Sequence, residues 1–193
     1  MDAGTPSQTI GPFFHFALDQ PDWSDLTTNA PPGERIVIEG QVLDGDRAPV
    51  DDALLEIWQA NAEGKYDHLE DPQADKRVDP RFRGFGRALT DAQGRYRFTT
   101  IRPGRVPGRD GAFLAPHINV AIFARGLLKQ LVTRIYFADE PANKTDPVLT
   151  EIADSTARRT LLALRHNTGA GPPAAYEFDI VLQGANETVF FDI

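Results

Sequence analysis

The chain contains no cysteine among its 193 residues. This absence excludes disulfide bonds, thiolate zinc sites, iron–sulfur clusters and a cysteine nucleophile. A metal ion would have to use His, Asp, Glu or Tyr, and the chain has four His and four Tyr. The composition therefore narrows the possible redox and metal chemistry before any motif is considered.

Basic residues and long apolar runs are also scarce. Lys and Arg total 20 against 28 Asp and Glu, which gives a net charge of −8 at pH 7. Nucleic-acid binders gain affinity by neutralising phosphates with Lys and Arg, so this balance argues against them. No run approaches the ~20 apolar residues that span a bilayer, and the N-terminus has neither a basic region nor an apolar signal core. We therefore expect a soluble, cytoplasmic protein.

What the sequence does contain is an ordinary globular composition with frequent turn signals. Hydrophobic residues make up 41% of the chain, which excludes disorder as its main state. The 16 Gly and 15 Pro are spread along the chain, a distribution typical of many short strands joined by turns. Turn signals such as Asp91-Ala92-Gln93-Gly94 and Arg102-Pro103-Gly104 lie between the candidate strands.

Alternating apolar residues predict an all-β protein. In the segment 35–42, Ile36, Ile38 and Val42 share one face, as in a strand with one side in the core. Further strands are predicted at 54–59, 96–99, 118–124, 131–137 and 176–182, and short helices at 147–153 and 157–165. This spacing implies an antiparallel β-sandwich, with Trp58, Tyr96, Tyr136 and Phe178 in its core. We expect one domain over 1–193, with about 1–30 forming an extended N-terminal arm.

Local motifs alone do not identify a catalytic site. Ser7, Ser24 and Ser155 lack the context of a nucleophile elbow, and no glycine-rich phosphate loop precedes a helix. Acidic residues gather at 70, 71 and 75, and such a charge run is predicted to be a solvated loop rather than a metal cage.

A series of longer motifs is more specific. In chain order they are Thr5–Phe13, Gly40–Val42, Leu55–Ala60, Gly64–Tyr66, Phe85–Arg87, Gly94–Phe98, Arg102–Gly104, Ala115–Asn119 and Glu187–Asp192. These motifs follow one another from near the start of the chain to near its end, and in this respect the sequence resembles the intradiol ring-cleaving dioxygenases. The resemblance implies an oxidoreductase that inserts O₂ into an aromatic ring.

The same resemblance implies a ferric ion held by two tyrosine phenolates and two histidines. Hard anionic oxygens favour Fe(III), and the ion lowers the phenol pKa so that the tyrosines bind ionised. The family's His-x-His pair corresponds here to His117-Ile118-Asn119, and Val106 stands where one tyrosine is expected. The loop from Asp71 to Pro80, where the other is expected, contains no tyrosine. We therefore expect no metal site in this chain and interpret His117 as a core histidine.

Loss of the iron ligands has a meaning within this family. Some members are built from two homologous chains, a beta chain that binds the iron and an alpha chain that does not. The sequence resembles the iron-free alpha chain. This resemblance implies a large α/β hetero-oligomer with Fe(III) on the beta chain, acting on a small aromatic acid and O₂ at a pocket between the chains.

Four positions resemble alpha-chain residues that line this pocket: Thr9, Gly11, Pro12 and Arg125. Glycine allows close backbone approach and proline fixes a turn, while arginine offers charge and paired hydrogen bonds to a carboxylate. Arg125 could equally pair with an acid at the core edge or on the partner chain, and Thr9 could be an ordinary cap or turn residue. No catalytic residue is assigned to this chain.

Two other hypotheses compete with this one. A non-enzymatic, transthyretin-like β-sandwich binding module would need neither the N-terminal motif nor the ending at Glu187–Asp192. A self-sufficient dioxygenase with unusual ligands is opposed by Val106 and Asn119.

Overall fold

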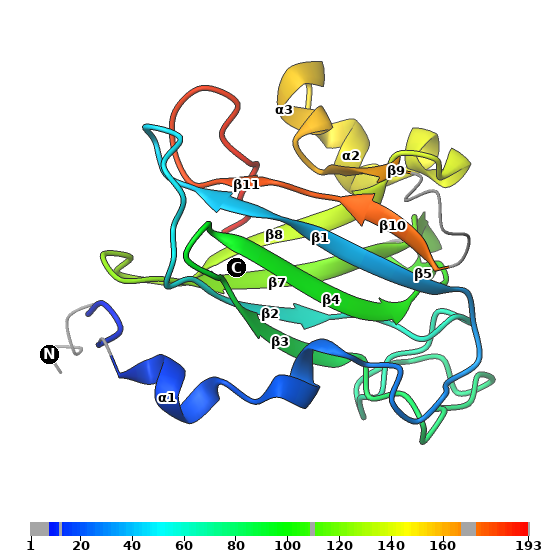
Figure 1. Cartoon of the computed structure of the whole chain (residues 1–193). Coiled ribbons are helices and arrows are strands. Elements are labelled where there is room, and N and C mark those ends of the chain that lie inside the picture. The colour runs from blue at the N-terminus through cyan, green and yellow to red at the C-terminus, as the bar shows by residue number, and fades with distance from the viewer. Residues whose placement is uncertain (1–7, 12, 109–110, 167–172, 193) are drawn as a thin grey trace, which may run out of the picture.

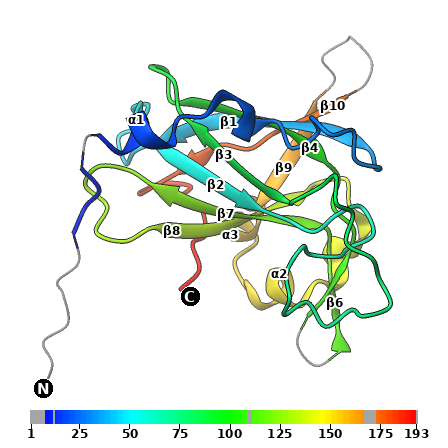
Figure 2. The same ribbon diagram turned by 90° about the horizontal axis from the view of Figure 1, so that it is seen from below.

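The structure is a sandwich of strands, nearly closed into a barrel, with a few short helices (Figures 1 and 2). This computed structural model describes residues 8–11, 13–108, 111–166 and 173–192. The strands are β1 (Arg35–Leu43), β2 (Leu54–Trp58), β3 (Phe85–Leu89), β4 (Arg95–Ile101), β5 (Val106–Pro107), β6 (Phe113–Leu114), β7 (His117–Phe123), β8 (Leu131–Phe137), β9 (Leu162–His166), β10 (Ala174–Glu177) and β11 (Ile180–Val181). The helices are α1 (Phe14–Leu18), α2 (Pro147–Glu151) and α3 (Ser155–Arg159), with 3₁₀ segments η1 (Pro21–Ser24) and η3 (Pro141–Thr145). The predicted all-β sandwich class is confirmed.

The strands are arranged in two layers. One layer pairs β4 with β1 and β1 with β10, and the other pairs β3, β2, β7 and β8 in that order. Strand β9 joins the layers, because it runs antiparallel to β10 and parallel to β8. The pairs of β1 with β10 and β11 are parallel too, so the sandwich is not purely antiparallel.

The core lies between these layers. Ile36, Ile38 and Phe98 face it from one side, and Ile118 and Ile122 from the other, each with 0% exposure. Burial of each such side chain contributes roughly 1.5–3 kcal/mol to stability. The alternation recognised in the sequence at 35–42 therefore marks the inward face of β1.

Most of the aromatic residues assigned to the core are buried there. Tyr96 and Phe178 belong to the main core, and Tyr136 is buried in a second cluster under α2. The assignment of Trp58 to the core was wrong. Its neighbour Ile57 faces inward, so the alternation of β2 turns the indole to the outer face, where it is half-buried.

The helix predicted at 157–165 is wrong in its second half. Helix α3 ends at Arg159 and β9 begins at Leu162. The amides of Tyr136 and Ala138 donate to the carbonyls of Leu161 and Ala163. This tertiary pairing with β8 outweighs the helix propensity of Leu, Ala and Arg.

The strand predicted at 176–182 is interrupted between β10 and β11, which both pair in parallel with β1. At the break the Asp179 side chain accepts a hydrogen bond from the Gln41 amide at 2.9 Å, and Tyr96 donates its phenol proton to the Phe178 carbonyl. A Cβ on Gly40 would lie 2.0 Å from that same carbonyl oxygen. The residue at position 40 therefore has to be glycine for this backbone approach.

The N-terminal segment runs along β3 and β4 (Figure 1). The Leu26 amide donates to the Thr99 carbonyl at 2.9 Å, and the Arg87 guanidinium lies 4.5 Å from the centre of the Trp23 ring. No helix of the described part of the chain is long and apolar enough to cross a membrane. The cytoplasmic location and the single domain with an arm at about 1–30 stay predictions.

We predict that Gly40→Ala strongly destabilises the fold. The added methyl group collides with backbone rather than with a flexible side chain, so overpacking should cost about 3 kcal/mol or more. The matched control is Gly45→Ala, whose Cβ would meet only ordinary contacts at 3.5 Å. Urea unfolding of both variants measures the effect, and equal stability of the two would contradict the assigned role of Gly40.

Candidate functional site

The outer face of β7 and β8 carries the positions that correspond to the histidine ligand pair. In the antiparallel register His117 lies opposite Tyr136 and Asn119 lies opposite Arg134. Because side chains alternate along a strand, these four share the outer face while Ile118 points into the core. On each strand the two residues stand two positions apart in the sequence, which puts their side chains on the same face.

His117 is a buried, neutral histidine. Its side chain is 3% exposed, and Nδ1 lies 2.8 Å from the Ala115 carbonyl oxygen, which places the ring proton on Nδ1. Burial, reinforced by the positive charge of Arg134, lowers the pKa of His117 to about 4. The interpretation of His117 as a hydrogen-bonded core histidine is confirmed.

Asn119 is held from three sides. Its amide nitrogen Nδ2 donates to the Trp58 carbonyl and to Tyr66 Oη, both at 3.2 Å. Its oxygen Oδ1 accepts from Nε of Arg134 at 3.1 Å. The side chain that stands at the second ligand position is thus committed to protein hydrogen bonds.

The two tyrosines beside this face are phenols rather than phenolates. Burial raises the pKa of Tyr66 and raises that of Tyr136 to about 12, although Arg134 opposes both shifts. Val106 is buried in β5 at a position expected to hold a ligand tyrosine. Within the residues described, no group of three or more His, Asp or Glu could hold a metal ion. This donor set does not fit a ferric ion.

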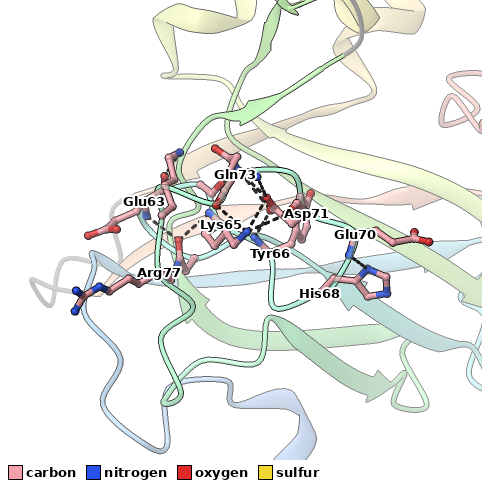
Figure 3. A network of polar contacts seen from close by, with 11 residues as sticks. Glu63, Lys65, Tyr66, His68, Glu70, Asp71, Gln73 and Arg77 are labelled. Carbon is pink, nitrogen blue, oxygen red and sulfur yellow. Dashed lines mark hydrogen bonds and ion pairs between the residues drawn. The ribbon is translucent and has the colours of Figure 1, made fainter.

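The loop that follows Tyr66 is fixed by a buried ion pair (Figure 3). Lys65 Nζ donates to Asp71 Oδ1 at 3.0 Å and to the Gln73 carbonyl at 3.0 Å. The two charged side chains are 8% and 3% exposed. The prediction that this acidic run is merely a solvated loop is therefore wrong for Asp71, although Glu70 is exposed.

Asp71 is stabilised as a carboxylate. Burial alone would raise its pKa, but hydrogen bonds from the amides of Gln73 and Tyr66 and from the Lys65 ammonium lower the pKa below its ordinary value. The Tyr66 ring stacks on Trp58 with ring centres 5.8 Å apart. The ion pair thus positions the loop against the outer face, beside Asn119.

A second group of residues meets at the turn after β7. The Gly126 amide donates to Thr9 Oγ1 at 2.8 Å, and Arg125 Nε donates to the Asp52 carboxylate. This ion pair raises the pKa of Arg125. The structure therefore brings two of the predicted pocket residues together, Thr9 and Arg125, and gives Arg125 the acidic partner that one interpretation anticipated.

Gly11 and Pro12 are the other two predicted pocket residues. Gly11 is exposed, and a Cβ added to it would meet nothing within 4 Å, so nothing in the described chain requires a glycine there. Pro12 lies outside the described residues. Whether Thr9, Gly11, Pro12 and Arg125 contact substrate stays a prediction.

The two groups lie at opposite ends of β7. Asn119 is near the start of the strand and Arg125 follows its end. Six residues of extended chain separate them by roughly 20 Å. The predicted pocket residues are therefore remote from this chain's own degenerate ligand pair.

Sequence reasoning missed several residues of the outer face. Arg134 had a signal, since it is a charged residue in the apolar strand Leu131–Phe137. Asp146 is 0% exposed. Its carboxylate caps α2 by accepting from the Leu149 amide, and it also accepts from the Ala115 amide at 2.7 Å. The sequence signal for this role was an aspartate just before a proline at the start of a helix. No feature of the sequence indicated that Lys65 pairs with Asp71.

We predict that Asp71→Asn lowers the free energy of unfolding by about 3–5 kcal/mol, because it leaves the buried Lys65 charge without its counterion. The pKa of Asp71 is lowered in the folded protein, so its stabilising effect is fully present above the ordinary carboxyl pKa and is lost as pH falls through the lowered pKa. Urea unfolding from pH 7 down to 3 should show the gap between wild type and variant closing only in acid. The exposed Asp75→Asn is the control, and a pH-independent gap would contradict this account.

Comparisons with known proteins agree with this geometry. A family model described as Dioxygenase matches residues 10–184. The chain is 42% identical to the protocatechuate 3,4-dioxygenase alpha chain of Pseudomonas putida, over 97% of this chain and 96% of that protein. It is 40% identical to the protocatechuate 3,4-dioxygenase beta chain of Burkholderia cepacia, over 94% of this chain and 77% of that protein.

A solved structure extends the comparison. The dioxygenase domain of a dioxygenase–carbohydrate-binding fusion from Streptomyces sp. SirexAA-E superposes with a TM-score of 0.64 at 32% identity, covering 95% of this chain and all of that one. Family model, relatives and fold agree along almost the entire sequence. The chain belongs to the intradiol dioxygenase family.

Proposed function

We propose that this chain is the iron-free alpha chain of a protocatechuate 3,4-dioxygenase. In a complex with a homologous beta chain it lines part of the substrate pocket. The complex inserts both atoms of O₂ between the hydroxyl-bearing carbons of protocatechuate and forms 3-carboxy-cis,cis-muconate. Similarity to alpha chains over nearly the full length supports this function.

The ferric ion belongs to the beta chain in this proposal. On the outer face of β7 and β8, His117 stands at one histidine ligand position and the Asn119 amide, already bonded to Arg134, stands at the other. Fe(III) favours anionic oxygen ligands, but Val106 occupies one position expected to hold a tyrosine, and the loop 71–80, where the other is expected, contains none. Held by the beta chain, Fe(III) would be chelated by the two hydroxyl oxygens of the substrate and would supply the activation of the substrate toward O₂.

The single observation that carries the proposal is the distance between Arg125 and the degenerate ligand pair. Thr9 and Arg125 gather at the far end of β7 from Asn119, roughly 20 Å along the strand. If these residues contact a substrate bound at iron, the iron lies in another chain. A pocket between alpha and beta chains meets that requirement.

Arg125 suits recognition of an aromatic acid. Asp52 contacts its Nε, while 58% of the side chain is exposed, so the guanidinium is oriented from one side and accessible from the other. A planar guanidinium can bind a carboxylate with two parallel hydrogen bonds. Thr9 joins the N-terminal segment to the same turn through Gly126.

The binding-module hypothesis is not favoured. The relatives that match along the chain are dioxygenase subunits, and they include both alpha and beta chains. The match also extends over regions that a minimal sandwich would not need.

We predict that iron and activity depend on the partner. Produced alone with iron, the chain should contain no stoichiometric metal, show no phenolate-to-iron absorption band and leave protocatechuate unchanged. Co-expression with the beta chain should give a defined α/β complex that binds iron and cleaves the substrate. Stoichiometric iron in the chain alone, or ring cleavage without a partner, would contradict the proposed function.

We predict that Arg125→Ala in the complex raises KM for protocatechuate and lowers kcat/KM about tenfold to a hundredfold, because a charge-assisted bond to the substrate carboxylate is lost. Arg125→Lys should recover only part of the loss, since it keeps the charge without the planar fork. Catechol, which has no carboxylate, should be affected much less. The iron absorption spectrum should not change.

The matched control for Arg125 is Arg97→Ala, an exposed arginine in an ion pair with Glu39 on another part of the surface. An equal loss for both substrates, or loss of iron or of the complex, would show that Arg125 is structural.

A further inference from the structure

Arg134 is a charged side chain at the centre of the degenerate ligand face. It is half-buried on β8. Its Nε donates to Asn119 Oδ1 at 3.1 Å and its Nη1 to Tyr136 Oη at 3.4 Å. The guanidinium also lies 5.7 Å from the centre of the Phe191 ring. One cation is thus surrounded by oxygen atoms and an aromatic face.

The groups around this cation are mostly neutral. Asn119 is an amide, and the His117 ring is bonded through Nδ1 to the Ala115 carbonyl. The Asp146 carboxylate lies 3.4 Å from Tyr136 Oη and also accepts the Ala115 amide. Among the described residues Arg134 forms no ion pair within 4.0 Å. Its positive charge is therefore met by neutral oxygen atoms and an aromatic ring rather than by a carboxylate.

We propose that the Arg134 guanidinium takes the place of the metal ion in this chain, and that its fixed charge excludes metals independently of the missing ligands. A metal ion coordinated at position 119 would lie within a few ångströms of the guanidinium. Like charges so close repel strongly where little water screens them. Metal binding is then opposed in two ways: the family's ligands are missing, and the Arg134 guanidinium repels a metal cation.

This inference rests on the proposed function, because both depend on matching His117 and Asn119 to the family's ligand pair. It adds a claim that loss of ligands alone does not make. Restoring the second histidine should not restore metal binding while Arg134 is present. Removing the arginine as well should make the face accessible to a cation.

The test uses the full-length chain and Co²⁺, whose visible absorption reports coordination by imidazole. We compare wild type, Asn119→His, Arg134→Met and the double variant Asn119→His/Arg134→Met. The double variant should bind Co²⁺ at least about tenfold more tightly than Asn119→His alone, given the repulsion that the arginine exerts. A control double variant, Asn119→His/Arg97→Met, removes an exposed arginine and should show no gain.

Circular dichroism and urea unfolding establish that each variant is folded. If Arg134→Met does not fold, the neutral and polar Arg134→Gln takes its place in the same comparison. The proposal is overturned if Asn119→His alone binds Co²⁺ as tightly as the double variant, or if neither binds it. Metal binding by the wild-type chain would instead contradict the proposed iron-free function, so the two failures are distinguishable.

Discussion

The antiparallel register between β7 and β8 is the constraint on which the rest of the structure depends. It places Ile118 beside Ile135 in the core and, on the other face, His117 beside Tyr136 and Asn119 beside Arg134. A slip of one residue would exchange the two faces and bury the polar row in the sandwich. Core packing and the character of the outer face are therefore set by one pairing.

The outer face shows how buried polar groups are stabilised without a metal ion. Burial of a polar atom is costly unless it is hydrogen-bonded. Asp146 meets this requirement by accepting from two backbone amides, and Asp71 by accepting from Lys65 and from the amides of Tyr66 and Gln73. At the two positions where the family carries histidine ligands, His117 and Asn119 are hydrogen-bonded to other groups of the protein. The face is consequently a structural element that holds the loop after β2.

Much of the fold and the family followed from the sequence, because alternation along a strand and the residues of a motif are local properties. The inward face of β1, the existence of a strand at 118–124 and the changed ligand pair at His117 and Asn119 were predicted in this way. The errors have a common cause. Leu162–His166 became a strand because β8 and β10 pair with it, and Asp71 became buried because Lys65 reaches it from another part of the loop.

By itself the sequence determined that no thiolate chemistry is available, that the ligand pair is incomplete and which faces of the main strands are apolar. Each of these is a property of residue identity or of short-range spacing. Only the tertiary structure decided that Arg134 contacts Asn119, that Thr9 joins the turn at Gly126 and that Arg125 pairs with Asp52. Those contacts join segments 15 to 117 residues apart. Their partners are selected by strand register and chain reversal, which no local pattern encodes.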